Sequence, residues 1–458
     1  MMAYGEHQLV FDLMDAIPQE SLPEEIGRGR NGSANKLDAQ DRPFHDWYRF
    51  VLSYPPHLVR TYLKDFGLDQ RHTVLDPFCG TGTTVVECKL NGIRGVGLEA
   101  NPFAHFASSV KLDWSIDAEA LQAMAHSVAN STWQALESQG IRDNEPFARG
   151  TQELPLRSLN DEAMALLLKG SISPLPLHKS LVLLDHIRAY QQTPEYRHAL
   201  LALANALVFR ISNLYFGPEV GVQSPKADVP VVSSWLHEVK KMVADLQQIN
   251  GGPFPLCQVH RVDSRSLTGI LPSASIDAVI TSPPYPNEKD YTRTTRLESV
   301  MLGFVNNKTE LRALKQQLVR SNTRGVYKGD DDDQWIAQHP EIQRIAEAIE
   351  QRRVEMGKNS GFERMYPKVT KLYFGGMARH LAELRAVLRP GAQLAYVVGD
   401  QASYLRVMIR TGQLIADIAQ ALGYEVVRID LFRTRLATAT REQLREEVVV
   451  LRWNGGSN

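Results

Sequence analysis

The feature that most constrains this chain is a short apolar run that stops at two adjacent prolines. Residues 276–285 read Ile-Asp-Ala-Val-Ile-Thr-Ser-Pro-Pro-Tyr. The apolar residues 278–280 predict a buried strand, and the prolines end it because proline cannot extend a sheet ladder and favours extended geometry in the residue before it. We therefore expect residues 282–285 to form a stiff loop at the carboxyl end of a strand, where open α/β sheets bind their ligands.

This loop offers the groups needed to hold a flat molecule that carries an amino group. Ser282 brings a hydroxyl, Pro283 and Pro284 bring carbonyls without competing amide donors, and Tyr285 brings an aromatic face. A lone tyrosine is more often a packing residue, but directly after Ser-Pro-Pro a stacking role is favoured. These four residues are the candidate catalytic residues.

A glycine-rich turn forms a second motif. Residues 73–84 read Thr-Val-Leu-Asp-Pro-Phe-Cys-Gly-Thr-Gly-Thr-Thr. Residues 73–75 predict a strand, and the two glycines permit a tight turn and close backbone approach to a ligand. A helix is expected over residues 83–91, followed by a strand over residues 95–98 that ends at Glu99, an acid suited to a ribose diol.

The glycine turn alone leaves two alternatives open, an ordinary strand–helix turn and a dinucleotide site. Asp76-Pro77 at its start argues against the dinucleotide site, because a carboxylate there would repel a pyrophosphate. The same carboxylate favours a cofactor with an amino-acid tail, which carries an ammonium group.

Together the two motifs resemble the signature of the amino-group DNA methyltransferases, and the Ser-Pro-Pro-Tyr form is most similar to the cytosine-N4 branch. The resemblance covers residues 44–112, 258–300 and, more loosely, 370–453. It implies a Rossmann-like doubly wound α/β fold, S-adenosylmethionine as cofactor, and double-stranded DNA with a flipped base as substrate. It assigns cofactor binding to Tyr48, Asp76, Phe78, Cys79, Gly80, Thr81, Gly82, Thr83, Glu99, Ala100, Asp263 and Ser264, and the target amine to the loop 282–285.

Simpler roles stay open for single residues. Glu99 alone suits a solvated acid at a strand end, and Asp263 alone suits a turn residue or a helix N-cap. The chain has three cysteines, Cys79, Cys88 and Cys257, and none follows a proline in a loop like that of cytosine-C5 enzymes. Their scatter predicts neither disulfides nor a metal site.

Composition limits the setting in which the chain works. Its 458 residues carry a net charge of −1, so any affinity for DNA must come from local basic surface. The chain lacks a signal peptide and an apolar run long enough to span a membrane. We expect a cytoplasmic protein without membrane contact that joins the nucleoid through DNA.

Local basic surface is expected just after the Pro-Pro-Tyr loop. The candidate DNA-binding residues there are Arg293, Arg296, Arg320 and Arg324. A solvated helix face is the alternative for these charges. Two interpretations of the acidic run Asp330–Asp333 stay open, a solvated loop or a surface that repels DNA.

The sequence predicts a catalytic domain that is interrupted twice. Residues 1–40 are expected to be flexible, and residues 41–112, 256–300 and 371–458 to form the catalytic domain. Residues 113–255, with periodic apolar stretches, predict a helical insertion for target recognition, and residues 301–370 a charged helical insertion that contacts DNA. Few residues follow the last predicted strand, so we expect no C-terminal recognition domain.

The leading hypothesis is a cytosine-N4 DNA methyltransferase with a cognate restriction endonuclease as partner. The motif order, cofactor turn first and amine loop second, is the reverse of many Ser-Pro-Pro-Tyr enzymes and keeps adenine-N6 methylation as the nearest alternative. Methylation of RNA guanine N2 or of protein glutamine is a third hypothesis, although those enzymes more often carry Asp or Asn before the prolines. A catalytically silent DNA-binding module is the fourth.

Overall fold

A computed structural model describes residues 19–21, 37–50, 53–143, 155–216, 220–249, 253–267, 269–287, 289–436 and 443–456. The predicted flexible segment 1–40 lies outside the described residues except for 19–21 and 37–40. Within the described ranges, no helix is long and apolar enough to cross a membrane. Among the same residues, His, Cys, Asp and Glu side chains form no group of three that would hold a metal ion.

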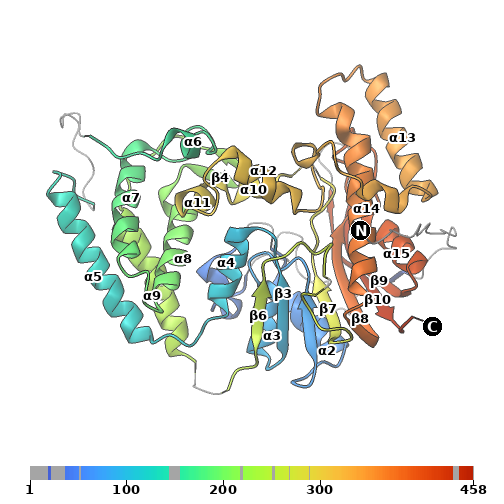
Figure 1. Cartoon of the computed structure of the whole chain (residues 1–458), viewed down its shortest axis with the longest axis horizontal. Helices are drawn as coiled ribbons and strands as arrows, with labels where there is room; N and C mark the ends of the chain where they lie inside the picture. The colour runs from blue at the N-terminus through green and yellow to red at the C-terminus, as the bar shows by residue number, and fades with distance from the viewer. Residues whose placement is uncertain are drawn as a thin grey trace.

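An eight-stranded, mostly parallel sheet forms the centre of the molecule (Figure 1). From β6 to β8 the neighbouring strands are parallel, whereas β10 is antiparallel to both β8 and β9. The prediction of a doubly wound α/β fold is confirmed. The order across the sheet is β1 (Gln19–Ser21), β9 (Glu425–Leu436), β10 (Gln443–Trp453), β8 (Leu388–Gly399), β7 (Ile276–Thr281), β2 (Thr73–Asp76), β3 (Arg94–Leu98) and β6 (Cys257–His260).

Strand β7 lies in the middle of this sheet and is buried on both faces. Ala278 and Ile280 pack on one face, in a core that includes residues of helix α2, and Val279 packs on the other, in a core that includes residues of α14. This alternation explains the continuous apolar run, since a parallel strand covered on both faces has no polar side. The covering helices are α2 (Pro56–Asp65) and α3 (Thr83–Leu90) on one face, and α14 (Tyr366–Leu384) and α15 (Thr411–Ala421) on the other.

The first helical region leaves the sheet after α4 (Pro102–Lys111) and has a large apolar core of its own. The predicted helical stretches are observed as α5 (Ala118–Glu137), α6 (Asp161–Met164), α7 (Pro174–Arg188), α8 (Tyr196–Ala206), the π-helix η3 (Leu207–Ile211) and α9 (Val231–Gln247).

Two short strands follow the helices of this region. The sequence predicts a helix end within residues 213–218 and an extended loop over residues 219–232. The helical turn η3 ends at Ile211, and β4 (Leu214–Phe216) pairs antiparallel with β5 (Val220–Val222), a pairing that the sequence analysis missed. Pairing across a short connection satisfies the backbone groups that a loop would have left to solvent.

The second helical region follows β7 and contacts both the first helical region and helix α14. Its first helices lie beside α6, and Val300, Val305 and Leu314 share a small apolar core with Ala163 and Leu166 (Figure 1). Its last long helix, α13, lies beside α14. Its elements are α10 (Tyr291–Thr294), α11 (Arg296–Met301), α12 (Lys308–Gln316), η4 (Thr323–Gly325), η5 (Asp332–Ile336), α13 (Pro340–Glu355) and η6 (Glu363–Met365).

Strand β8 begins earlier than the sequence predicts. Residues 389–391 read Arg-Pro-Gly, which predicts a turn, but β8 already begins at Leu388 and continues through them. Its register against β7 shifts, because Ile276 pairs with Leu388 while Ala278 pairs with Gln393. The extra residues form a bulge, and Gly391, with a φ of 89°, permits its left-handed backbone.

Candidate active site

The glycine turn after β2 and the Pro-Pro-Tyr loop after β7 open into one cavity of about 370 Å³. They meet because β2 and β7 are parallel neighbours, with Val74 opposite Ala278 and Leu75 opposite Val279. All four candidate catalytic residues line this cavity. The predicted cofactor residues that also line it are Phe78, Cys79, Gly80, Thr81, Thr83, Glu99, Ala100 and Ser264.

Asp76 lies behind the cavity wall and joins the two loops. Its carboxylate is fully buried and accepts hydrogen bonds from the hydroxyl of Thr281, at 2.6 Å, and from the amide of Phe78, at 3.1 Å. Thr84 makes a second tie, since its hydroxyl donates to the carbonyl of Ile280 at 3.1 Å. Burial raises the pKa of Asp76 to about 6. Asp76 is thus placed to fix the spacing between the two motifs, and it is not among the residues that line the cavity.

The two glycines of the turn serve different needs. Gly80 has a φ of 53° and faces the cavity, and its amide donates to Glu99 Oε2 at 2.8 Å. Gly82 has a φ of 89° and packs against α4, where an added Cβ would lie 3.0 Å from the Cβ of Ser108. Gly82 therefore lets α3 begin close to α4 and is not itself part of the lining.

Glu99 is the acid that lines the cavity beside the glycine turn. Its other carboxylate oxygen, Oε1, accepts from the amide of Asn101 at 2.7 Å, so both oxygens are oriented by backbone donors. Burial raises the pKa of Glu99 to about 7. A carboxylate fixed in this way retains lone pairs that can accept from a diol.

The turn is supported by two packing contacts. An added Cβ on Gly97 would lie 2.6 Å from Cys79 Sγ, so β3 passes close beneath the turn. Lys111, only 1% exposed, donates to the carbonyl of Thr81 at 2.7 Å, and burial lowers its pKa to about 7. Lys111 was missed from the sequence, where it is one more lysine at a helix end.

Asp263 and Tyr48 are held away from the cavity lining. The carboxylate of Asp263 accepts from the amide of Arg265 at 2.9 Å and from its guanidinium at 2.7 Å, as expected for the turn residue considered as an alternative. Tyr48 is buried and donates its hydroxyl to Glu298 of α11. The neighbours of these two residues, Val262, Ser264, Phe50, Ser53 and Tyr54, line the cavity instead.

The Pro-Pro-Tyr loop is held from two sides. The hydroxyl of Ser282 donates to the carbonyl of Val397 at 3.2 Å. The amide of Tyr285 donates to the hydroxyl of Tyr291 at 3.1 Å. The ring of Tyr285 lies against Gly399, where an added Cβ would come within 3.0 Å. The close contact with Gly399 fixes one edge of this ring.

The four arginines predicted to bind DNA differ in their surroundings. Arg324 is exposed, and its guanidinium lies 5.6 Å from the ring centre of Phe362. Arg296 donates to a carbonyl of α10 and to that of Leu166, just after α6, and Arg320 is buried in an ion pair with Asp330. Arg293 is partly buried, and its Nε has no hydrogen-bond partner among the described atoms.

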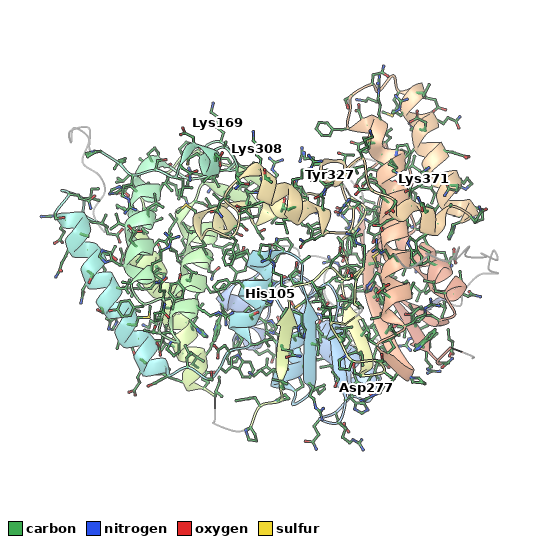
Figure 2. All side chains as sticks on the ribbon, in the orientation of Figure 1. His105, Lys169, Asp277, Lys308, Tyr327 and Lys371 are labelled. Carbon is green, nitrogen blue, oxygen red and sulfur yellow. The ribbon has the colours of Figure 1, made fainter. Side chains whose placement is uncertain are left out.

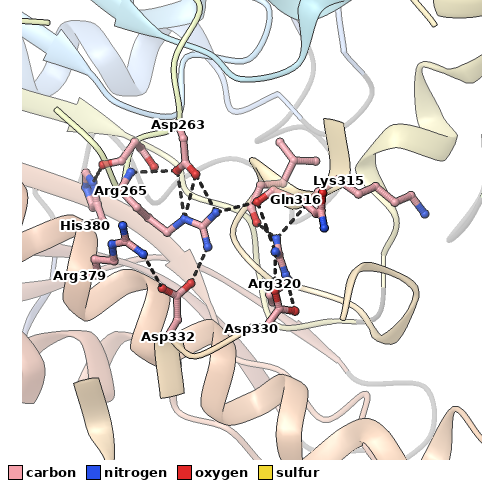
Figure 3. Close-up of polar contacts among 11 residues, drawn as sticks. Asp263, Arg265, Lys315, Gln316, Arg320, Asp330, Asp332, Arg379 and His380 are labelled. Atoms are coloured by element: carbon pink, nitrogen blue, oxygen red, sulfur yellow. Dashed lines mark hydrogen bonds and ion pairs between the residues drawn. The ribbon is translucent and has the colours of Figure 1, made fainter. Parts of the chain in front are cut away.

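Three carboxylates of the acidic run form ion pairs within the fold, whereas Asp331 is exposed. Asp330 pairs with Arg320 at 2.7 Å, and Asp332 pairs with Arg265 at 2.5 Å and with Arg379 at 3.3 Å (Figure 3). Asp333 pairs with Lys368 at 2.6 Å. These carboxylates fasten the second helical region to the catalytic sheet and to α14.

Comparison with known proteins agrees with this arrangement. A family model described as DNA methylase matches residues 31–108. The chain is 25% identical over 440 residues to the Type II methyltransferase M.BsoBI of Geobacillus stearothermophilus, covering 90% of this chain and 85% of the relative. It is 22% identical over 447 residues to the Type II methyltransferase M.AvaI of Nostoc, covering 90% and 87%. By both comparisons the chain is similar to the amino-group DNA methyltransferases.

Two solved structures share weaker similarity with this methyltransferase. TrmN from Thermus thermophilus has a TM-score of 0.28 at 12% identity and covers 90% of this chain and 52% of that chain. The [4+2]-cyclase SpnF has a TM-score of 0.31 at 8% identity and covers 92% and 98%.

Similarity to this family implies S-adenosylmethionine as the methyl donor, and the cavity suits such a molecule. Its volume lies in the usual range for small-molecule sites. Gly80 leaves the backbone approachable, and Glu99 presents an oriented acid beside it. The donor and acceptor groups of the wall therefore fit the proposed cofactor.

Proposed function

We propose that this methyltransferase transfers a methyl group from S-adenosylmethionine to the exocyclic N4 amine of a cytosine flipped out of duplex DNA. One observation carries the proposal: the glycine turn, Glu99 and the loop from Ser282 to Tyr285 line the same cavity. A methyl donor held by the turn and an amine held by the loop would thus share one enclosed space. Placing the two in line supplies most of the acceleration that such a reaction needs.

The Pro-Pro-Tyr loop suits the activation of a base amine. Such an amine is a poor nucleophile because its lone pair is conjugated into the ring. Acceptors for its N–H groups, the Ser282 hydroxyl and the Pro283 carbonyl, favour a more tetrahedral nitrogen and so free the lone pair. When bound, S-adenosylmethionine supplies a methyl group on a positively charged sulfur. Tyr285 stacks on the base and offsets part of the cost of flipping it.

The two helical regions suit the task of holding DNA over the cavity. In Figure 2, Lys169 and Lys308 lie on the side of the sheet opposite Asp277, which stands near the beginning of β7. Cations on that side lie toward the carboxyl ends of the parallel strands, where the cavity opens. We assign target recognition to residues 113–255 and further DNA contacts to residues 301–370, with Arg324 as the most exposed of the four arginines.

The relatives suggest the biological setting. M.BsoBI and M.AvaI are named Type II methyltransferases, and together they span most of this chain. We therefore assign the protein to a restriction–modification system, in which it marks host DNA at the nucleoid against a cognate endonuclease.

Adenine N6 is the second candidate target. The cofactor turn precedes the amine loop in this chain, whereas many Ser-Pro-Pro-Tyr enzymes have the reverse order. Ser282 in place of aspartate favours cytosine, so the two observations point in different directions.

Labelled methyl transfer to duplex DNA, followed by nucleoside mass spectrometry, tests the proposal. N4-methylcytosine is the expected product. N6-methyladenine would transfer the assignment to the second candidate. Label found only in RNA or protein, or no transfer at all, would overturn both.

A further inference from the structure

A segment of the second helical region supplies a third wall of the cavity. We call residues 315–322 the strap; Lys315, Gln317, Leu318, Val319, Arg320, Ser321 and Asn322 all line the cavity. Neither sequence motif includes the strap, and the chemistry described above assigns it no role. Because the strap lines the same cavity as the loop from Ser282 to Tyr285, its side chains are candidates for a further substrate contact.

Buried ion pairs hold the strap in one position (Figure 3). The guanidinium of Arg320 binds Asp330 at 2.7 Å and donates to the carbonyl of Lys315 at 2.9 Å. From the catalytic sheet, Arg265 donates to the carbonyl of Gln316 at 3.1 Å while it binds Asp332. The side chains on the strap are therefore preorganised, which is what a precise contact to a substrate requires.

One polar atom on the strap lacks a partner. Asn322 is 8% exposed, and its side-chain nitrogen donates to the carbonyl of Lys289 at 3.1 Å. Because a carbonyl only accepts, this contact fixes which end of the amide is nitrogen. The oxygen, Oδ1, has no hydrogen-bond partner among the described residues. A buried acceptor left unpaired costs about 1–3 kcal/mol, so a donor from a bound molecule would remove a penalty already present.

The hydrogen bond from Asn322 to Lys289 indicates which bound molecule would supply the donor for Oδ1. Lys289 belongs to the segment that follows the Pro-Pro-Tyr loop, and Ser321 also donates to its carbonyl, at 3.4 Å. The cofactor turn and Glu99 come instead from β2 and β3. Asn322 is thus tied to the part of the cavity that holds the target amine.

We propose that Asn322 is a further substrate-contacting residue, whose Oδ1 accepts a hydrogen bond from the exocyclic amine of the flipped base. On cytosine as on adenine, that amine is the only N–H donor that remains on the base edge once the sugar is attached. The two N–H groups of the amine would then be shared among three acceptors, Asn322 Oδ1, the Ser282 hydroxyl and the Pro283 carbonyl. The inference rests on the proposed function and deepens it, because it names a residue that distinguishes bases with this amine from bases without it.

The test compares Asn322→Ala and Asn322→Ser with the wild type and with Asn306→Ala. Asn306 is an exposed asparagine of the same region and serves as the matched control. Affinity is measured for S-adenosylmethionine alone, and for duplexes that carry the mapped target base or an analogue without the amine, 2-pyrimidinone for cytosine or purine for adenine. Methyl transfer is measured at saturating cofactor.

Both Asn322 variants should bind S-adenosylmethionine within about twofold of the wild type, yet transfer methyl groups roughly 5- to 100-fold more slowly. They should also lose the preference for the base that carries the amine, whereas Asn306→Ala keeps it. Variants that retain this preference, or that lose cofactor affinity as much as transfer, would overturn the inference. A wild type that methylates no DNA would instead overturn the proposed function, so the two failures are distinguishable.

Discussion

The cofactor turn and the strap form two walls of one cavity, but different interactions hold them in place. The turn depends on backbone geometry and near neighbours: Gly80 and Asn101 both donate to Glu99, at most 19 positions away. The strap depends on buried charges, since Arg265, which donates to the carbonyl of Gln316, pairs with Asp332, 67 positions away. Backbone geometry is written into local sequence, whereas ion pairs between distant residues become visible only in the fold.

The largest effect should come from removing Arg265, the buried charge that donates to the main chain of the strap. Arg265→Met takes away the partner of the half-buried Asp263 and one of the two partners of the buried Asp332, which keeps Arg379. We expect a loss of about 3 kcal/mol in the free energy of unfolding. Urea denaturation measures it. Arg344→Met, which breaks an exposed pair with Glu341, is the control and should cost less than about 1 kcal/mol. Equal losses would show that the buried pairs do not hold the strap.

A smaller loss of stability should follow from adding a side chain at Gly375 of α14, where the acidic run packs closely against the helix. An added Cβ on Gly375 would lie 1.9 Å from the carbonyl oxygen of Asp332, so Gly375→Ala should destabilise by about 2–3 kcal/mol. The midpoint of thermal unfolding is the readout. Gly376→Ala is the matched control, because its Cβ would keep 3.4 Å from its nearest neighbours. If both variants melt together, the close contact at Gly375 is not required.

Removing the stacking ring should affect transfer and spare cofactor binding. Tyr285→Ala should lower the transfer rate by a factor that corresponds to about 1–3 kcal/mol, with the affinity for S-adenosylmethionine nearly unchanged. Tyr285→Phe keeps the ring and separates stacking from any role of the hydroxyl. A parallel fall in cofactor affinity would contradict the assignment of Tyr285 to the base.

The reverse pattern is expected at the cofactor turn. Gly80→Val forces a branched residue to a φ of 53°, at a cost of about 1–2 kcal/mol, and should weaken cofactor binding more than it slows transfer at saturating cofactor. Gly67→Val imposes a similar strain at a φ of 65° outside the cavity lining. Calorimetric titration should therefore find a changed cofactor affinity only for Gly80→Val. A changed affinity in both variants would show that the loss does not come from the cofactor turn itself.

The smallest effect is a pH dependence of the cofactor wall. The pKa of Glu99 is raised to about 7, so its carboxylate is charged above that pH and protonated below it. A protonated acid accepts less well from a diol, and the affinity for S-adenosylmethionine should fall roughly tenfold or less between pH 8 and pH 6. Glu99→Gln should bind more weakly at pH 8 and lose this dependence. A wild-type affinity that stays flat with pH would argue against the ribose role of Glu99.

Sequence reasoning found the sheet and the two loops because both depend on short-range signals. Strand β7 stops just before Pro283 and the cofactor turn contains Gly80, so each loop is marked locally by a proline or a glycine. The same reasoning could not place Asp263, whose carboxylate is held by Arg265, or foresee that Asp76 would bind Thr281, 205 positions away. Asn322 gave no signal, since only the fold shows that one end of its amide is satisfied and the other is not.

The contact between Gly375 and the main chain of Asp332 has a practical consequence. At this contact the main chain of Asp332 packs against Gly375, so the contact does not depend on side chains that point away from α14. The outward-facing residues of α13 and of the loops around it are therefore open to exchange without disturbing the seat on α14. This lobe is the natural position at which to graft a different DNA-reading surface onto an unchanged catalytic sheet.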